Sequence, residues 1–246
     1  MKNNIILLFF LIFLISCNQP VQNNEESKQK TSNGKKDGLV VKYRKDGTLL
    51  SEVNYKNGKR HGIAKDYYRN GKIRLELTYA NDLKHGKQVW FYENGDIFEI
   101  CPFTNGMING IRKFYHERNK IKAEIPYKNN HPGIGLKEYM HNGKLKKKYP
   151  KLVIKSMDNR DTEGKYILRI SLSDGSEKVK FYRGDLMENK YKGNGIIEIF
   201  TMEGIGELIF PAQKGTPINE KVSIIGEFIT KDGNPLILHK DYYLKL

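Results

Sequence analysis

Few residues of this chain combine the types and the spacing that chemistry requires. His61 and His85 lie 24 residues apart, and two histidines could ligate a metal ion if the fold brought them together. No cysteine or carboxylate accompanies them in the same register, so we expect both to be turn residues. The acidic residues look scattered, and no zinc-protease, Walker, nucleophile-elbow or dinucleotide-binding motif occurs. The sequence therefore predicts a non-enzymatic protein with no catalytic residues, metal or cofactor.

The two cysteines have different surroundings in the sequence. Cys101 lies in an apolar strand pattern with Ile97 and Phe103, so we expect a small core residue rather than a reactive thiol. Cys17 follows an unbroken apolar run over residues 5–15. That run is shorter than the ~20 residues needed to cross a bilayer, but it suits the core of a signal peptide.

Leu14-Ile15-Ser16-Cys17 resembles the bacterial lipoprotein box. The resemblance implies that residues 1–16 are a signal peptide and that Cys17 begins the mature chain and carries a lipid. Residues 17–35 are polar, which predicts a disordered tether. We therefore expect a protein that is lipid-anchored to a membrane of the cell envelope, with the outer membrane favoured.

The positive charge of the chain is unevenly distributed. The net charge is +15, yet residues 151–246 hold 15 lysines and arginines against 14 acidic residues, and residues 36–150 carry +12. Basic residues interleaved with aromatic ones usually suggest nucleic acid. Predicted export instead favours anionic lipid, an acidic envelope polymer or a protein partner, and no nucleic acid. The alternative is a solvated face that keeps the sheet soluble.

The candidate binding residues are Arg74, Lys87, Trp90, Arg112, Lys113, Lys137, Lys144, Lys146, Lys147 and Lys148. For Trp90, packing within the sheet is favoured over an exposed patch.

The elements that position these residues follow a period of 24 residues. Five registers of glycine, aromatic or turn residues keep the same phase, which indicates a repeat array. The registers are Gly38, Gly62, Gly86 and Gly110; Tyr43, Tyr67, Phe91, Tyr115 and Tyr139; Tyr55, Tyr79, Phe103 and Tyr127; Gly47, Gly71, Gly95, Asn119 and Gly143; and Gly58, Asp82, Gly106 and Asn130.

Each period contains two short runs and two turns, as expected of stacked hairpins. Asn70-Gly71 is a strong hairpin signal, and a three-residue loop places Tyr67 and Ile73 on one face. Alternation then predicts that Ile73, Leu75, Leu77 and Tyr79 share one face and that Arg74, Glu76 and Thr78 share the other. The array over residues 36–150 should be an elongated antiparallel meander.

The repeats resemble the MORN repeat (membrane occupation and recognition nexus), in the bacterial variant of proteins named for the YwqK-type antitoxin. The pattern is G-x-x-x-x-Y-x-x-N-G followed by Y-x-x-G-x-x-x-G. Its residues are Gly62, Tyr67, Asn70, Gly71, Tyr79, His85 and Gly86, then Phe91, Asn94, Gly95, Phe103, Gly106 and Gly110. The resemblance implies an elongated sheet that serves as a binding scaffold without catalytic residues. In the last unit the opening glycine is displaced by one position, to Gly135.

Residues 151–246 lose the period and show about seven short strands punctuated by turns. This pattern predicts a β-sandwich of immunoglobulin-like type, with a five-stranded barrel as the alternative. We therefore expect an all-β envelope lipoprotein that uses its basic repeat sheet as a binding scaffold. An antitoxin or immunity-type lipoprotein that neutralises a toxin is the alternative, and an enzyme acting on envelope glycans through the C-terminal domain is a third reading.

Overall fold

The computed structural model describes residues 27–28, 31–32 and 34–245. The predicted signal peptide, Cys17 and the first part of the predicted tether lie outside these residues. The rest of the tether segment contains three two-residue strands: β1 (Ser27–Lys28), β2 (Thr31–Ser32) and β3 (Lys35–Lys36). Because β1 pairs with the first array strand and β2 pairs with β3, strand pairing begins before residue 36, where the tether was predicted to end. Among the described residues, no helix is both long enough and apolar enough to cross a membrane.

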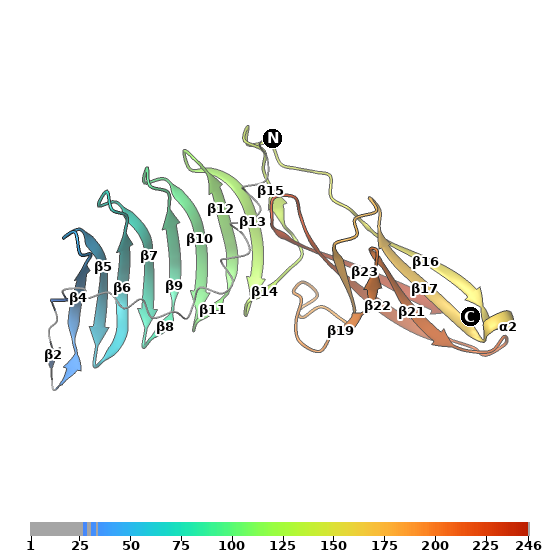
Figure 1. Cartoon of the computed structure of the whole chain (residues 1–246). Coiled ribbons are helices and arrows are strands. Elements are labelled where there is room, and N and C mark those ends of the chain that lie inside the picture. The colour runs from blue at the N-terminus through green and yellow to red at the C-terminus, as the bar shows by residue number, and fades with distance from the viewer. Residues whose placement is uncertain (1–26, 29–30, 33, 246) are drawn as a thin grey trace.

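The array is one long antiparallel sheet, as the sequence predicted (Figure 1). Successive hairpins lie side by side, and thirteen strands of the described residues belong to it. After β1, these strands are β4 (Gly38–Tyr43), β5 (Leu49–Lys56), β6 (Lys59–Tyr67), β7 (Ile73–Ala80), β8 (Leu83–Lys84), β9 (Gly86–Phe91), β10 (Ile97–Thr104), β11 (Met107–Ile108), β12 (Gly110–His116), β13 (Lys120–Lys128), β14 (His131–Pro132) and β15 (Lys137–Glu138).

Both predicted turn registers have positive backbone φ angles. In the first turn of the second unit, Gly71 has φ 80° and donates its amide to the Tyr68 carbonyl, which closes the expected three-residue loop. The second turn of every unit has two central residues with positive φ, as a type I′ hairpin requires. These pairs are Asn57-Gly58, Asn81-Asp82, Asn105-Gly106 and Asn129-Asn130.

The predicted alternation is wrong at two residues of β7, Ile73 and Arg74, because a β-bulge follows the first turn. Tyr67 pairs with Ile73 and Asp66 pairs with Leu75, so Arg74 is an extra residue opposite that step. Ile73 therefore lies on the face opposite Leu75, and Arg74 turns toward the side of Leu75, where it contacts Asp66. The same shift of register recurs at Leu50, Phe98 and Lys122, one period apart.

One face of the sheet, which we call the core face, carries the buried residues. Ala64, Leu75 and Leu77 form a cluster on it against which Trp90 packs, in agreement with the packing favoured for this residue. Cys101 is 2% exposed, as predicted, and burial raises the pKa of its thiol to about 11. On the same face, each opening glycine pairs across the strands with an aromatic ring: Gly38 with Tyr55, Gly62 with Tyr79, Gly86 with Phe103 and Gly110 with Tyr127.

The C-terminal part consists of two four-stranded sheets around one apolar core. Their order, β16-β17-β21-β20 and β19-β18-β22-β23, is the A-B-E-D and C′-C-F-G order of immunoglobulin-like sandwiches, so that prediction is confirmed. The elements are β16 (Leu152–Asn159), α2 (Arg160–Glu163), β17 (Lys165–Leu172), β18 (Val179–Arg183), β19 (Ile197–Ile199), β20 (Thr201–Met202), β21 (Ile205–Pro211), β22 (Asn219–Ile229) and β23 (Pro235–Lys245).

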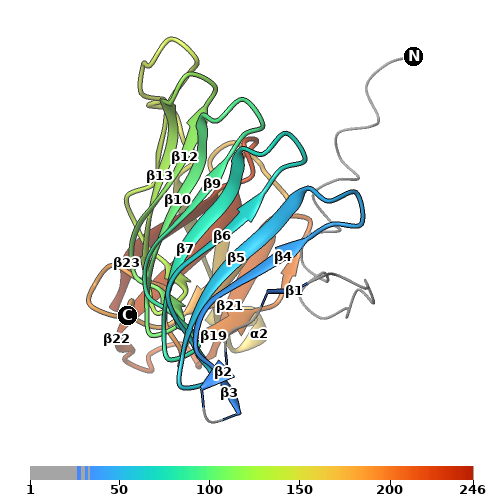
Figure 2. The same cartoon turned by 90° about the vertical axis from the view of Figure 1, so that its left-hand side faces the viewer.

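The sandwich packs on the last unit of the array (Figure 1) and therefore lies behind the array in the end-on view of Figure 2. Ile125, Tyr127 and Leu136 of the array form one buried cluster with Leu236 of the sandwich. Backbone bonds add to this contact, because the Ile134 amide donates to the Lys190 carbonyl. The C-terminal end of the array is therefore covered, in accord with a cap that an open sheet needs.

Candidate binding surfaces

The face opposite the core face, which we call the open face, carries a continuous row of cross-strand pairs. Directly paired residues of an antiparallel sheet point to the same side, so the row can be traced strand by strand. This middle row consists of Val41, Glu52, Lys65, Glu76, Val89, Ile100, Lys113, Glu124 and Lys137. Its charges alternate in sign at both ends around an apolar centre.

Charges in the middle row pair with one another. The Lys113 ammonium lies 3.0 Å from a carboxylate oxygen of Glu124, and Lys137 lies 3.9 Å from the other oxygen. Partial burial opposes ionisation of Glu124, but hydrogen bonds from Lys113 and Tyr139 lower its pKa. The hydrogen bond to Glu124 likewise raises the pKa of Lys113. The open face is therefore not the basic surface that composition suggested.

The predicted binding residues do not share one face. Lys87, Lys113 and Lys137 lie on the open face, and Lys87 and Lys137 are exposed. Arg74, Trp90 and Arg112 lie on the core face. The Arg112 guanidinium donates to the buried Glu99 carboxylate at 2.8 Å and stacks on Phe114, so it belongs to the packing of the sheet.

The predicted lysine cluster after β15 is also divided. Lys144, Lys147 and Lys148 are exposed. Lys146 instead pairs with Asp232 of the sandwich and lies 3.8 Å from the buried Glu138. Lys146 therefore contributes to the junction between the array and the sandwich.

A second row of the open face holds the aromatic register. Each ring pairs with an aliphatic residue across the first turn, in the pairs Tyr43–Leu49, Tyr67–Ile73, Phe91–Ile97, Tyr115–Ile121 and Tyr139–Leu145. The backbone carbonyls of four of these aromatic residues accept hydrogen bonds from the preceding unit, whose donors are Arg44, Tyr68, Tyr92 and His116. The aromatic row is thus held by one bond per period.

Positive charge gathers at the edge formed by the second turns, which we call the second-turn edge. In the first two units this edge carries Lys56, Lys59 and Arg60, next to Lys35 and Lys36 of β3. Two acidic residues lie there as well: Asp82 pairs with Arg60 at 3.0 Å, and Asp37 accepts a hydrogen bond from the Asn57 amide at 3.0 Å. Cations also lie over the rings of the core-face aromatic register, Lys36 over Tyr55, Arg60 over Tyr79 and Lys84 over Phe103.

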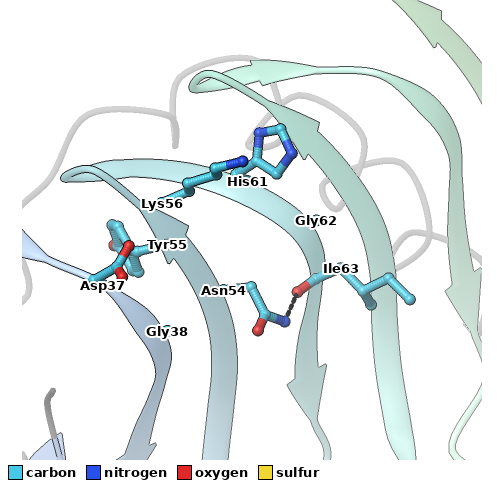
Figure 3. A pocket seen from close by; sticks show the side chains of 8 residues that line it. All are labelled: Asp37, Gly38, Asn54, Tyr55, Lys56, His61, Gly62 and Ile63. Atoms are coloured by element: carbon cyan, nitrogen blue, oxygen red, sulfur yellow. Dashed lines mark hydrogen bonds between the residues drawn. The ribbon is translucent and has the colours of Figure 1, made fainter.

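An open depression lies at this basic edge (Figure 3). Lys56 and His61 line it from one side, and Asn54 lies at its base, where its amide donates to the Ile63 carbonyl at 2.7 Å. His61 and His85 are exposed beside their turns, as expected for turn residues. No group of three potential metal ligands occurs within the part of the chain that the structure describes.

Three registers escaped the sequence analysis although each has the same period of 24. Glu52, Glu76 and Glu124 face the lysines of the middle row, so the expectation of scattered acidic residues is wrong. Lys36, Arg60 and Lys84 form the second register, and the donors to the aromatic row form the third. A search of every phase of the period for charged and polar residues finds all three.

Four consecutive segments of the array match the family model of the MORN repeat variant. The matched residues are 36–57, 60–81, 84–105 and 108–129. No curated protein matches the chain. The half-unit with the Tyr139–Leu145 pair continues the same geometry beyond the last match. Residues 36–129 are therefore similar to four MORN repeats of the variant type, a type of repeat that suggests a binding or scaffold role.

Proposed function

We propose that this protein is an envelope lipoprotein, anchored through Cys17, whose repeat array acts as a non-enzymatic binding scaffold at an anionic membrane surface. The observation that supports the proposal most is the charge at the second-turn edge. Lys56 and Lys59 are exposed there, and neither forms a hydrogen bond or an ion pair with a side chain of the described residues. These two lysines flank the second turn of the first unit, next to the segment that leads back toward the predicted anchor.

Apolar side chains at the same edge suit an interface with lipid. Leu83 and Met107 are 50% and 41% exposed beside their second turns. Cations flanked by exposed apolar residues favour the boundary between head groups and acyl chains, and each lysine or arginine near an anionic surface contributes about 1 kcal/mol. In the fourth unit the cation over the ring is replaced by Ile108, which packs toward the sandwich. The proposed contact therefore covers the first three units.

The anchor is tested by fractionation. Replacing Cys17 by alanine removes the thiol that would carry the lipid, so the variant should leave the membrane fraction of the producing cells, whereas Cys101→Ala should stay there. Metabolic labelling with a fatty acid should mark the wild-type chain and not Cys17→Ala. Equal membrane retention and equal labelling of the two variants would refute the anchor.

The surface is tested on vesicles with the chain from residue 18 onward, which lacks the anchor. Lys56→Gln/Lys59→Gln/Arg60→Gln should weaken binding to vesicles containing anionic lipid by about tenfold or more at low salt. The matched control, Lys144→Gln/Lys147→Gln/Lys148→Gln, removes the same charge from the segment that follows β15, away from the second-turn edge, and should bind as the wild type does. Equal losses in both triple variants would mean that only net charge matters. Absence of wild-type binding at low salt would end the proposal.

A further inference from the structure

The middle row of the open face has a charge order that complements its own reverse. Read from β5 to β15, the row is Glu52, Lys65, Glu76, Val89, Ile100, Lys113, Glu124 and Lys137. Read backward, every acidic position becomes basic, every basic position becomes acidic, and the two apolar positions remain apolar. A surface with this property can pair with a copy of itself.

We propose that two copies of this chain associate through their open faces, about a two-fold axis parallel to the strands and between β9 and β10. This arrangement brings Glu52 opposite Lys137, Lys65 opposite Glu124, and Glu76 opposite Lys113. Val89 lies opposite Ile100 at the centre. Each contact occurs twice, as in any isologous two-fold interface.

The aromatic row supports the same axis. With β9 over β10 of the partner copy, Phe91 faces Ile97, Ile73 faces Tyr115, and Tyr67 faces Ile121. Each ring thus meets an aliphatic side chain, which permits the interdigitation that sheets packed about 10 Å apart require. The row is suited to this contact because the donors of the preceding units fix its backbone.

Other arrangements of the two faces bring like charges together. A two-fold axis along the array would set Glu52 on Glu52 and Lys65 on Lys65. A slip of one strand from the proposed register would set Glu52 against Glu124 and Lys65 against Lys113. Like charges at contact distance oppose association, so the row selects one orientation and one register.

Within the described part of the chain, the sandwich leaves the open face uncovered, and this face is large enough for an interface. The apolar contact with the sandwich is made by the core-face residues Ile125 and Tyr127, and the Lys128–Glu188 ion pair lies beyond the three rows, next to the second turn. Its three rows cover roughly 38 Å by 18 Å, on the order of 700 Å² for each copy, close to the ~800 Å² of a standard interface. The third row adds exposed apolar side chains at Leu39, Ile63 and Ile111.

Cysteine crosslinking of the full chain in its own membranes tests the orientation. Because facing sheets lie about 10 Å apart, which is too far for a disulfide, Glu52→Cys/Lys137→Cys is treated with a short bis-maleimide and should give a covalent dimer on a denaturing gel. The two positions are roughly 34 Å apart within one copy, so a short reagent cannot link them within the same chain. Each single variant should remain monomeric, because Glu52 of one copy does not face Glu52 of the other. A dimer from a single variant, or none from the double variant, would overturn the proposal.

Charge reversal tests the pairing by sedimentation of the detergent-solubilised full chain. Glu76→Lys should raise the dimer dissociation constant about tenfold or more, because it faces Lys113 of the partner. Glu76→Lys/Lys113→Glu should restore the dimer. Within one copy the double variant sets lysine beside Lys65 and glutamate beside Glu124. If positions 76 and 113 acted only within one copy, the double variant would therefore form the dimer more weakly than the single variant does. A wild type that stays monomeric at all concentrations, or a double variant weaker than the single one, would refute the interface.

Discussion

Residue choice at the hairpin tips follows from backbone φ. The second turns place two consecutive residues in the left-handed region, where side chains other than those of glycine, asparagine and aspartate are strained. The chain accordingly alternates Gly58, Asp82, Gly106 and Asn130 at one position, all with positive φ. Which residues this position accepts depends on the backbone conformation and not on the available space, because a Cβ atom at Gly106 would make only an ordinary contact, 3.6 Å from Leu83.

Gly106 therefore distinguishes conformational strain from crowding. Gly106→Ala should lower the free energy of unfolding by about 1–2 kcal/mol, the cost of holding an ordinary residue in the left-handed region. Gly106→Asn should cost clearly less, since Asn130 adopts the same conformation one period later. Denaturant unfolding followed by circular dichroism measures both values. Equal losses for alanine and asparagine would contradict this account.

The hairpins are coupled to one another by a bond that recurs once per period. The Tyr92 hydroxyl donates to the Tyr115 carbonyl at 3.0 Å, and Tyr68 makes the equivalent bond to Phe91 at 2.6 Å. Burial raises the pKa of both phenols, which keeps them protonated donors at neutral pH. These bonds join units that the cross-strand ladder already pairs.

Removing one hydroxyl should weaken the array locally. Tyr92→Phe should lower the free energy of unfolding by about 0.5–1.5 kcal/mol, the usual contribution of one hydrogen bond. Tyr43→Phe is the matched control, because the Tyr43 hydroxyl has no hydrogen-bond partner within the described part of the chain. Chemical denaturation compares the two variants. A similar loss in both would show that the Tyr92 hydrogen bond contributes no more than a hydroxyl without a partner does.

At the level of the hairpin, the period and turn types could be predicted from the sequence, but the faces could not. Asn-Gly pairs and the 24-residue spacing are local signals that hold whatever the neighbouring strands do. Which side Arg74 occupies depends on the bulge, and the bulge is a feature of pairing between two strands. Trp90 and Arg112 were therefore grouped with Lys87 although the sheet separates them. The register of Glu52, Glu76 and Glu124 is difficult to recognise in the sequence because Ile100 takes the place of a glutamate in one unit.

In the whole molecule, the two ends of the array differ. At the first end, β4 pairs beyond the array only with the two residues of β1 among the described residues. At the other end the sandwich covers the sheet, and a buried carboxylate joins the two parts. Glu138 is 2% exposed and accepts hydrogen bonds from Thr230 at 2.6 Å and Asn234 at 2.7 Å. The pattern of short strands and turns in residues 151–246 predicted the sandwich, but nothing local to Glu138 indicates that its partners lie in the turn between β22 and β23.

Loss of this carboxylate should separate the unfolding of the two parts. Glu138→Ala leaves the buried donors of Thr230 and Asn234 without their acceptor, at a cost of about 3 kcal/mol. The single tryptophan, Trp90, reports on the array alone, whereas circular dichroism reports on both parts. Wild-type transitions by the two probes should coincide, and those of Glu138→Ala should diverge.

Glu188→Ala removes an exposed ion-pair partner of Lys128 at the same junction, so its cost should stay within ~1 kcal/mol and its transitions should still coincide. Coincident transitions in Glu138→Ala would mean that the apolar cluster around Leu236 couples the array to the sandwich without the carboxylate.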